Sequence, residues 1–333
     1  MSNTDMQPIG VVLLNLGGPD SLDAVEPFLV NLFLDPDILP FPFGRFARSF
    51  LARTIARRRA EKVKEYYRKI GGGSPIFPLT RKQAEGLEKE LKSQGNFKVL
   101  IAMRYWHPTT EEAIDQMGRL NLKRVVLLPL YPQFSTATTE SSFKEFERVR
   151  KEKGGENWEV LKIPHWYDHP LVIDSLVLQI KNALQNIPVL ENQPLHIVFS
   201  AHGVPLRLIQ KGDPYQNQIE ENVRLIGQSL GGSYPIHLCY QSRVGPLRWT
   251  GPSTDEMLKD LAAHGVKNLL MIPISFVSDH SETLYEMDIL YRDLAHQLGI
   301  HGFHRMPSLN DSPAFIKALS GIVVDSCHSN RWL

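Results

Sequence analysis

One histidine and two glutamates stand where acid–base chemistry could be carried out. His202 follows the apolar run His196–Ser200 and precedes Gly203, so a strand and a turn would hold its imidazole in place. An imidazole with an unperturbed pKa of about 6.5 exchanges protons near neutrality. A hydrogen-bonded structural histidine is an equally good interpretation, because the chain contains 12 histidines.

A second polar segment begins at Ser278, after the apolar run Leu269–Ile274. Asp279 is a good helix N-cap with Glu282 at the third helical position, as in a capping box. Glu286 lies four residues after Glu282, so both carboxylates would share one helix face, where like charges are mildly destabilising. This acidic pair could accept cations or protons beside a strand-end histidine, and a solvated helix face explains it equally well.

Short apolar runs alternate with longer amphipathic stretches, a pattern typical of parallel sheets that helices cover on both faces. Ligands of such sheets bind beyond the carboxyl ends of the strands, where positions 16 and 202 both fall. The expected strands are Ile9–Leu14, Lys98–Met103, Val125–Leu130, His196–Ser200, Ile236–Tyr240 and Leu269–Ile274. The expected helices include Arg81–Leu91, Glu111–Leu120, Leu171–Leu184, Asp213–Ser229 and Thr254–His264.

The sequence also repeats with an offset of 144 residues. Pro108–Glu112 precedes Val125–Pro129, and Pro252–Glu256 precedes Leu269–Pro273. Each pair reads as an N-capped helix followed by a strand that ends in proline. We therefore expect an α/β fold of two similar lobes, residues 8–165 and 166–312, around a ligand cleft. A helix at residues 313–326 could pack back on the first lobe.

Composition excludes several classes of protein. The 333 residues are 42% hydrophobic and 22% charged, which is typical of globular domains and not of disordered chains. The net charge of +1 argues against a nucleic-acid partner. The polar N-terminus shows no signal peptide, and the two cysteines favour a reducing, cytoplasmic setting. The sequence carries no signal for an oligomeric state.

Residues 28–69 combine apolar and basic side chains. Phenylalanines and leucines crowd residues 28–50, and residues 45–69 then hold ten Lys/Arg against Glu61 and Glu65, a local charge of +8. Such a lip could contact an anionic membrane surface or an apolar substrate that bears carboxylates. A packed helix pair with a solvated basic face is the equal alternative.

Several motifs occur in the order found in ferrochelatases, and over about residues 10–325 the sequence resembles that family. They are Leu14–Pro19, Tyr67–Ile76, Arg104-Tyr105 with His107-Pro108, Leu130–Gln133, Phe199–Gly203, Gln241–Pro246 with Trp249, and Ser278–Glu286.

The resemblance implies two Rossmann-like, chelatase-type lobes and the last step of haem biosynthesis, in which Fe²⁺ enters protoporphyrin IX and two protons leave. It implies His202 as the base, with Glu282 as its partner at the metal and Glu286 in an acidic line that relays protons or delivers metal. Iron would be bound by His202 and Glu282, with His280 as a further candidate. Porphyrin contacts are implied at Leu16, Arg59, Tyr67, Ser74, Arg104, Tyr105 and Trp249.

Two departures and three alternatives accompany this resemblance. Leu290 stands where the family often has a further acid, and Leu16 where relatives carry Met or Tyr, of which Tyr marks the coproporphyrin enzymes. No cofactor is expected, because two cysteines cannot hold the iron–sulfur centre of some relatives. Coproporphyrin III is the alternative substrate, and a non-catalytic porphyrin or haem carrier is the alternative function. A nucleotide-dependent enzyme is disfavoured, since Gly71–Gly73 lacks a phosphate-loop ending.

Overall fold

The computed structural model describes residues 7–36, 38, 45–188, 193–243 and 247–333. The chain divides into two compact units. Unit 1 comprises Met1–Leu130, Ser135–Pro164 and Leu319–Leu333, and unit 2 comprises Tyr131–Phe134 and His165–Ala318.

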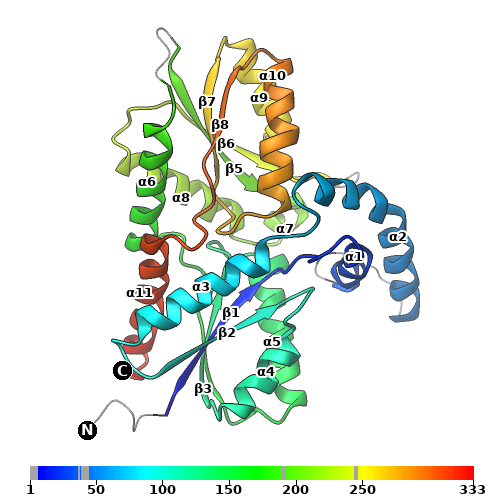
Figure 1. The fold of residues 1–333 in the computed structure, drawn as a ribbon, viewed down its shortest axis with the longest axis vertical. Coiled ribbons are helices and arrows are strands. Elements are labelled where there is room, and N and C mark those ends of the chain that lie inside the picture. Colours follow the sequence, from blue (N-terminus) through cyan, green and yellow to red (C-terminus); the bar gives the residue numbers. More distant parts are fainter. Residues whose placement is uncertain (1–6, 37, 39–44, 189–192, 244–246) are drawn as a thin grey trace. The chain divides into compact units, whose positions relative to one another are not determined.

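Unit 1 is built on a four-stranded parallel sheet (Figure 1). Its strands lie in the order β2 (Phe97–Met103), β1 (Ile9–Asn15), β3 (Arg124–Pro129) and β4 (Glu159–Lys162). Its helices are α1 (Val25–Leu34), α2 (Arg45–Lys69), α3 (Ile76–Leu91), α4 (Thr110–Arg119), the π-helix η1 (Thr136–Glu140) and α5 (Ser141–Glu152).

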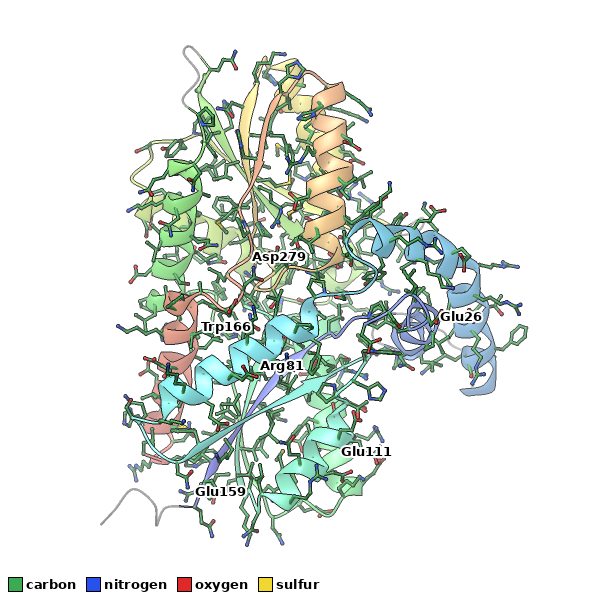
Figure 2. The ribbon with its side chains drawn as sticks, in the orientation of Figure 1. Glu26, Arg81, Glu111, Glu159, Trp166 and Asp279 are labelled. Atoms are coloured by element: carbon green, nitrogen blue, oxygen red, sulfur yellow. The ribbon has the colours of Figure 1, made fainter. Side chains whose placement is uncertain are left out.

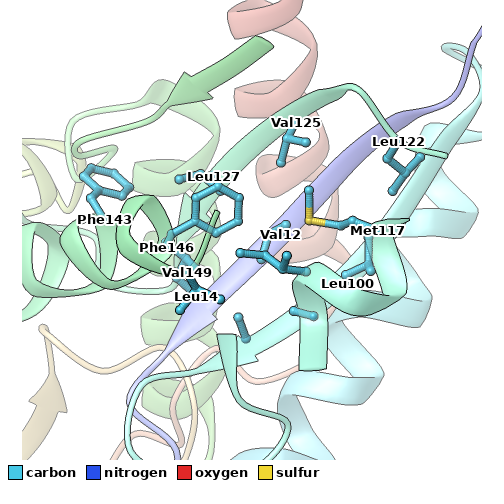
Figure 3. Close-up of a cluster of buried hydrophobic side chains, with 13 residues drawn as sticks. Val12, Leu14, Leu100, Met117, Leu122, Val125, Leu127, Phe143, Phe146 and Val149 are labelled. Carbon is cyan, nitrogen blue, oxygen red and sulfur yellow. The ribbon is translucent and has the colours of Figure 1, made fainter. Parts of the chain in front are cut away.

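One face of this sheet packs against α4 and α5 (Figure 3). Val12 and Leu14 of β1 are buried in one cluster with Met117 of α4 and with Phe143 and Phe146 of α5. The alternate residues of the strand point to the other face and are also buried, as expected for a parallel strand covered on both sides. The hydrophobic runs are therefore long and continuous because neither face of the sheet meets water.

Unit 2 repeats this plan with the strand order β6 (Ile236–Gln241), β5 (Leu195–His202), β7 (Asn268–Pro273) and β8 (Gly302–Arg305). Figure 1 shows α9 and α10 on one side of this sheet and α6 and α8 on the other. Trp166, at the beginning of the unit, is buried with its ring 5.9 Å from that of Phe315 (Figure 2). The helices are α6 (Pro170–Gln185), α7 (Leu206–Gln210), α8 (Tyr215–Ser229), α9 (Thr254–Ala263), the π-helix η2 (Glu282–Tyr291), α10 (Arg292–Gln297) and α11 (Pro313–Ser329), whose last residues belong to unit 1.

The internal repeat predicted from the sequence is confirmed. Both sheets have the same strand order, and each third strand leads into a π-helix. Thr109 and Ser253, 144 positions apart, both form the expected capping boxes, with Glu112 and Glu256. The α/β fold of two similar parallel-sheet units is thus the predicted one.

All six expected strands form, with ends within two residues of the prediction. Two strands were missed, β4 and β8, which have four residues each and lie at the edges of their sheets. Short edge strands bury less apolar surface and so carry a weaker sequence pattern.

Most described apolar residues of the predicted lip pack inward. Phe28, Leu29 and Phe33 on α1 are buried in a cluster with α2, whereas Phe50 on α2 is 75% exposed. The packed helix pair therefore accounts for most of these side chains. Leu39, Phe41 and Phe43 lie outside the described residues, and no described helix is both long and apolar enough to cross a bilayer.

Candidate active site

His202 is the last residue of β5, at the carboxyl end of the sheet in unit 2. The chain turns directly afterwards at Gly203, whose N–H donates to the carbonyl oxygen of Gln241 at 2.8 Å. A Cβ at position 203 would lie 2.9 Å from that same oxygen. Only glycine leaves room for this close approach of β5 and β6, so the turn that the sequence predicted after His202 depends on it.

The main chain of His202 is held by a closed ring of hydrogen bonds. Its N–H donates to Oγ of Ser275 at 2.9 Å, and its carbonyl accepts from the hydroxyl of Tyr215 at 3.0 Å. The Ser275 hydroxyl in turn hydrogen-bonds to the Tyr215 oxygen. Ser275 follows β7 and Tyr215 begins α8, so three elements fix the backbone from which the imidazole projects.

Glu282, the first residue of η2, lies at the centre of the polar cluster. Its Oε2 is 2.7 Å from Nδ1 of His202 and 2.7 Å from Oγ of Ser242. Its Oε1 is 3.8 Å from Nε2 of His280. Burial opposes ionisation of Glu282, but the charge of His202 and its hydrogen bond, and then His280, hold the pKa of the carboxyl well below its usual range.

The imidazole and Glu282 form an ion pair when His202 is protonated. Burial alone would lower the pKa of His202, but the charge of Glu282 and the hydrogen bond to it outweigh burial and raise that pKa. The side chain of His202 is 39% exposed, so it remains accessible from solvent.

Glu286 completes the cluster and holds its proton more tightly than an ordinary carboxylic acid. Burial, followed by the charge of Glu282, raises the pKa of Glu286 to about 7. Its Oε2 is 2.7 Å from the Ser242 hydroxyl and 3.1 Å from Nε2 of Gln241. The predicted convergence of Glu282 and Glu286 on one side of their helix is confirmed, although the helix is a π-helix.

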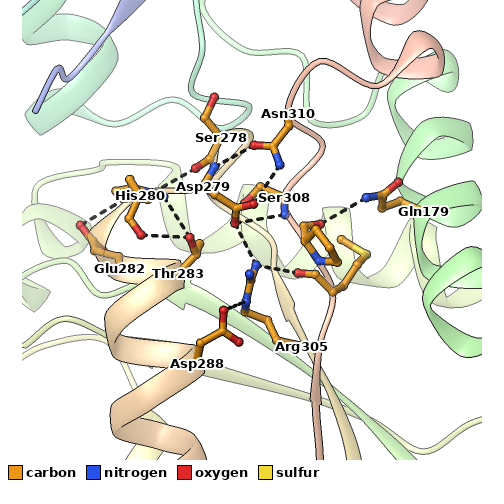
Figure 4. A network of polar contacts seen from close by, with 12 residues as sticks. Gln179, Ser278, Asp279, His280, Glu282, Thr283, Asp288, Arg305, Ser308 and Asn310 are labelled. Atoms are coloured by element: carbon orange, nitrogen blue, oxygen red, sulfur yellow. Dashed lines mark hydrogen bonds and ion pairs between the residues drawn. The ribbon is translucent and has the colours of Figure 1, made fainter. Parts of the chain in front are cut away.

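The prediction that Asp279 caps the helix is wrong. Asp279 instead accepts from Nη1 of Arg305 at 2.8 Å and from Nδ2 of Asn310 at 2.8 Å (Figure 4). Arg305 also donates to Asp288 of η2 at 2.8 Å. A buried arginine competes successfully for this carboxylate, and the resulting network ties the segment before η2 to the end of β8.

The predicted iron ligands His202, Glu282 and His280 are therefore brought together around one carboxylate. Among the described residues, no group of three or more His, Cys, Asp and Glu side chains is arranged to hold a metal ion. The pairing of the His202 imidazole with the Glu282 carboxylate suits proton exchange.

Three of the predicted porphyrin contacts gather in unit 1. Leu16, directly after β1, packs against the buried cluster that contains Tyr67 and Tyr105. The N–H of Tyr105 donates to the carbonyl of Leu16 at 3.0 Å. Leu16 follows β1 just as His202 ends β5, so the two positions correspond in the repeat.

Arg104 is fixed by a buried carboxylate that sequence reasoning missed. Asp35 accepts from Nη2 of Arg104 at 2.8 Å, from the hydroxyl of Tyr105 at 2.6 Å and from Oγ of Ser141 at 2.7 Å. Arg104 and Asp35 also line a cavity of ≈ 540 Å³ together with Arg48, Lys144, Arg148 and others. An aspartate that follows an apolar helix carried no distinctive signal in the sequence.

The remaining predicted contacts are dispersed. The guanidinium of Arg59 lies 5.6 Å from the centre of the Phe33 ring on α1, and Ser74 is buried next to Gly18. In unit 2, Trp249 pairs with Pro205, close to Gly203. Sequence reasoning also missed Ser242 and Tyr215 as partners of the acid–base residues. Ser242 lies in the family motif Gln241–Pro246, and this motif was the one sequence feature that pointed to it.

The chain is similar to proteins of one family along nearly its whole length. The family model described as Ferrochelatase matches residues 8–327. A ferrochelatase from Geobacter metallireducens is 50% identical over 314 residues, covering 94% of this chain and 96% of the relative. One from Aquifex aeolicus is 48% identical over 314 residues, covering 94% and 98%. One from Nostoc sp. is 47% identical over 324 residues, covering 96% and 83%.

Among solved structures, SirB from Bacillus subtilis with Fe³⁺ is similar with a TM-score of 0.59. Its sequence is 12% identical, and the match covers 97% of each chain. At this identity the likeness concerns the fold alone.

Proposed function

The chain belongs to the ferrochelatase family and is thus a metal chelatase of haem biosynthesis with iron and a porphyrin as substrates, and we propose that the porphyrin is protoporphyrin IX. The reaction inserts Fe²⁺ into the macrocycle, forms protohaem and releases the two pyrrole N–H protons. The contact between Nδ1 of His202 and Oε2 of Glu282, at 2.7 Å, is the observation that carries the proposed mechanism.

His202 is proposed to remove a pyrrole proton. A carboxylate beside Nδ1 keeps the N–H on that nitrogen, so the lone pair of the neutral ring lies on Nε2. The same carboxylate stabilises the imidazolium that forms when Nε2 accepts the proton, as in other carboxylate–histidine pairs. The raised pKa of His202 makes the neutral ring a stronger base.

Glu282 and Glu286 are proposed to act on the second proton and on the metal. Carboxylate oxygens suit a divalent cation, and the imidazoles of His202 and His280 supply nitrogen ligands that ferrous iron also accepts. Glu286, with its pKa of about 7, can take up or release a proton at neutral pH. Contact with iron is transient in this proposal, because the metal leaves in the product.

Unit 1 is proposed to bind the porphyrin through apolar and basic side chains. Leu16, packed against the buried Tyr67 and Tyr105, offers an apolar surface for the ring, and Arg59 offers positive charge for the propionates. Arg104 is paired with Asp35, so it is proposed to contact the porphyrin through its remaining N–H groups. Ser74 in unit 1 and Trp249 in unit 2 are the other proposed contacts. Binding energy used to bend the ring would expose a pyrrole nitrogen to the base and to the metal.

No resident cofactor is proposed. An iron–sulfur cluster takes four protein ligands, as a rule cysteines, and the chain has two cysteines, both buried.

The experiment that tests the proposed substrate is to compare turnover of protoporphyrin IX and coproporphyrin III by the purified chain with Fe²⁺ under anaerobic conditions. A higher kcat/KM for protoporphyrin IX is expected, because Leu16 and its neighbours favour the more apolar ring. A preference for coproporphyrin III would refute the substrate, and stoichiometric porphyrin binding without turnover would indicate a carrier.

A peripheral contact with an anionic membrane surface is also proposed, with the chain working in the cytoplasm. The exposed Phe50 shares α2 with Arg53, Arg57 and Arg58, which are exposed as well. Each basic residue near such a surface contributes about 1 kcal/mol.

Co-sedimentation with vesicles that contain phosphatidylserine tests this contact. Changing Arg53, Arg57 and Arg58 to glutamine should weaken association by roughly two orders of magnitude at low salt. The control changes the exposed Lys181, Lys211 and Lys259 to glutamine, an equal change in charge. Equal effects of the two triple variants would contradict a specific contact through α2.

A further inference from the structure

Ser242 has an unusual backbone for its residue type. It follows the end of β6 and has φ of +65°, in the left-handed region that favours glycine. A residue other than glycine at such a position costs of order 1 kcal/mol or more. What serine provides there beyond glycine is its hydroxyl group.

That hydroxyl lies between the two carboxylates of the acid–base cluster. Its oxygen is 2.7 Å from Oε2 of Glu282 and also 2.7 Å from Oε2 of Glu286. Two ionised carboxylates would repel one another at this range. A hydroxyl has one hydrogen and two lone pairs, so it can donate to one carboxyl group and accept from the other when that group is protonated. In this way the Ser242 hydroxyl bridges the two side chains where repulsion would otherwise separate them.

Gln241, the residue before Ser242, also holds Glu282 and Glu286 in place. Nε2 of Gln241 donates to the carbonyl oxygen of Glu282 at 2.9 Å and to Oε2 of Glu286 at 3.1 Å. The amide oxygen of Gln241 accepts from the buried Ser200 hydroxyl of β5 at 2.7 Å, which fixes the orientation of the amide. The end of β6 thus presents two adjacent polar side chains to the beginning of η2.

We propose that Ser242 is a positioning residue, whose left-handed backbone aims its hydroxyl so that the carboxylates of Glu282 and Glu286 are held at a fixed separation and act together on the metal. This inference rests on the proposed role of the two carboxylates in metal insertion. It assigns to Ser242 no contact with the porphyrin.

The test uses substitutions that separate the hydroxyl from the backbone. Ser242→Gly removes the hydroxyl and suits the left-handed backbone, so the variant should unfold at a temperature at least equal to that of the unchanged protein. Ser242→Ala removes the hydroxyl and keeps the Cβ. Asn121→Gly is the matched control, because Asn121 has φ of +51° in a turn before β3, outside the acid–base cluster.

Steady-state kinetics with Fe²⁺ and with Zn²⁺ provide the readout. We expect both Ser242 variants to lower kcat/KM for the metal by about tenfold, the loss typical of one hydrogen bond to a charged group, with the KM for porphyrin unchanged. The change Ser242→Gly should have a smaller effect in a Glu286→Gln background than in the unchanged protein, because one of the two carboxylates that the hydroxyl holds is already altered. Asn121→Gly should leave kinetics unchanged.

Two results would overturn the proposal. If Ser242→Gly is stable and keeps the unchanged protein's kcat/KM for metal, the hydroxyl has no positioning role, and the proposed function stands. If the unchanged protein itself inserts neither Fe²⁺ nor Zn²⁺ into a porphyrin, the proposed function is wrong and the role of Ser242 falls with it.

Discussion

Nδ1 of His202 and Oε2 of Glu282 lie 2.7 Å apart, although the two residues are 80 positions apart in the sequence. The contact joins the carboxyl end of β5 to the first residue of η2. It raises the pKa of the imidazole and lowers that of the carboxyl, so each group stabilises the charged form of the other.

Glu282→Gln should lower turnover far more than Glu286→Gln. Glutamine at position 282 removes the charge that stabilises the imidazolium, a loss of about 10²-fold or more for a group of this kind. Glu286 contacts Ser242 and Gln241 and does not contact the imidazole directly. Glu286→Gln should therefore lower kcat by only about tenfold. Steady-state kcat with Fe²⁺ measures both effects, and equal, mild losses would reduce the two carboxylates to a structural role.

The acidic limb of the pH–rate profile should belong to His202. Because the pKa of His202 is raised in the folded protein, kcat/KM should reach half its maximum above pH 6.5 and fall as the pH is lowered further. Glu282→Gln removes the main cause of the elevation, so the limb should move to lower pH. Glu286→Gln should move it less, since Glu286 contributes less to the shift. A limb that stays in place in Glu282→Gln would contradict this assignment.

Tyr215→Phe should lower kcat by about two- to tenfold without changing the KM for porphyrin. The hydroxyl of Tyr215 donates to the carbonyl of His202 at 3.0 Å, and a hydrogen bond of this kind contributes about 0.5–1.5 kcal/mol. Tyr234→Phe is the control, because Tyr234 precedes β6 at the opposite end of the parallel strands. Equal kinetics of the two variants would show that the ring of hydrogen bonds around His202 does not affect the reaction.

Asp279→Ala should lower the free energy of unfolding by about 3 kcal/mol, the loss expected when one partner of a buried ion pair is removed. The side chains of Asp279 and Arg305 are 12% and 8% exposed. Burial opposes ionisation of Asp279, but Arg305 and Asn310 lower its pKa, so its contribution is complete above the ordinary pKa of 3.8 and is lost only as the pH falls through the lower folded value.

Urea unfolding at about pH 5 and pH 8 should therefore give the same deficit for Asp279→Ala. Asp174→Ala, an exposed aspartate of α6, is the control and should change stability by less than about 0.5 kcal/mol. If Asp279→Ala also changed the free energy of unfolding by less than about 0.5 kcal/mol, the hydrogen-bond network of Asp279 and Arg305 would contribute little to stability.

The parts of the fold that sequence reasoning predicted are those with a local periodic pattern. Six buried strands could be predicted because each is a continuous apolar run, and the repeat because Thr109 and Ser253 begin similar helices. The edge strands β4 and β8 could not, since four residues with mixed burial give no pattern.

The residues of the candidate site likewise fall into those with a local sequence signal and those that depend on distant partners. The positions of His202, Glu282 and Glu286 at strand and helix ends made them candidates but left a structural role equally open, and the resemblance to ferrochelatases singled them out. Asp35 was missed because its partners lie 69, 70 and 106 positions away and only the folded chain brings them together. The role of Asp279 was predicted wrongly because local capping was assumed, whereas Arg305, 26 positions later, binds the carboxylate instead.

The most direct test of the account is turnover by His202→Ala. The central claim is that the imidazole of His202, paired with Glu282, removes a pyrrole proton so that iron can enter the ring. We predict that this variant binds protoporphyrin IX with a Kd close to that of the unchanged protein and loses turnover by a factor of about 10³ or more. The control is His264→Ala, an exposed histidine of unit 2. Turnover within a few-fold of the unchanged protein in His202→Ala would contradict the claim.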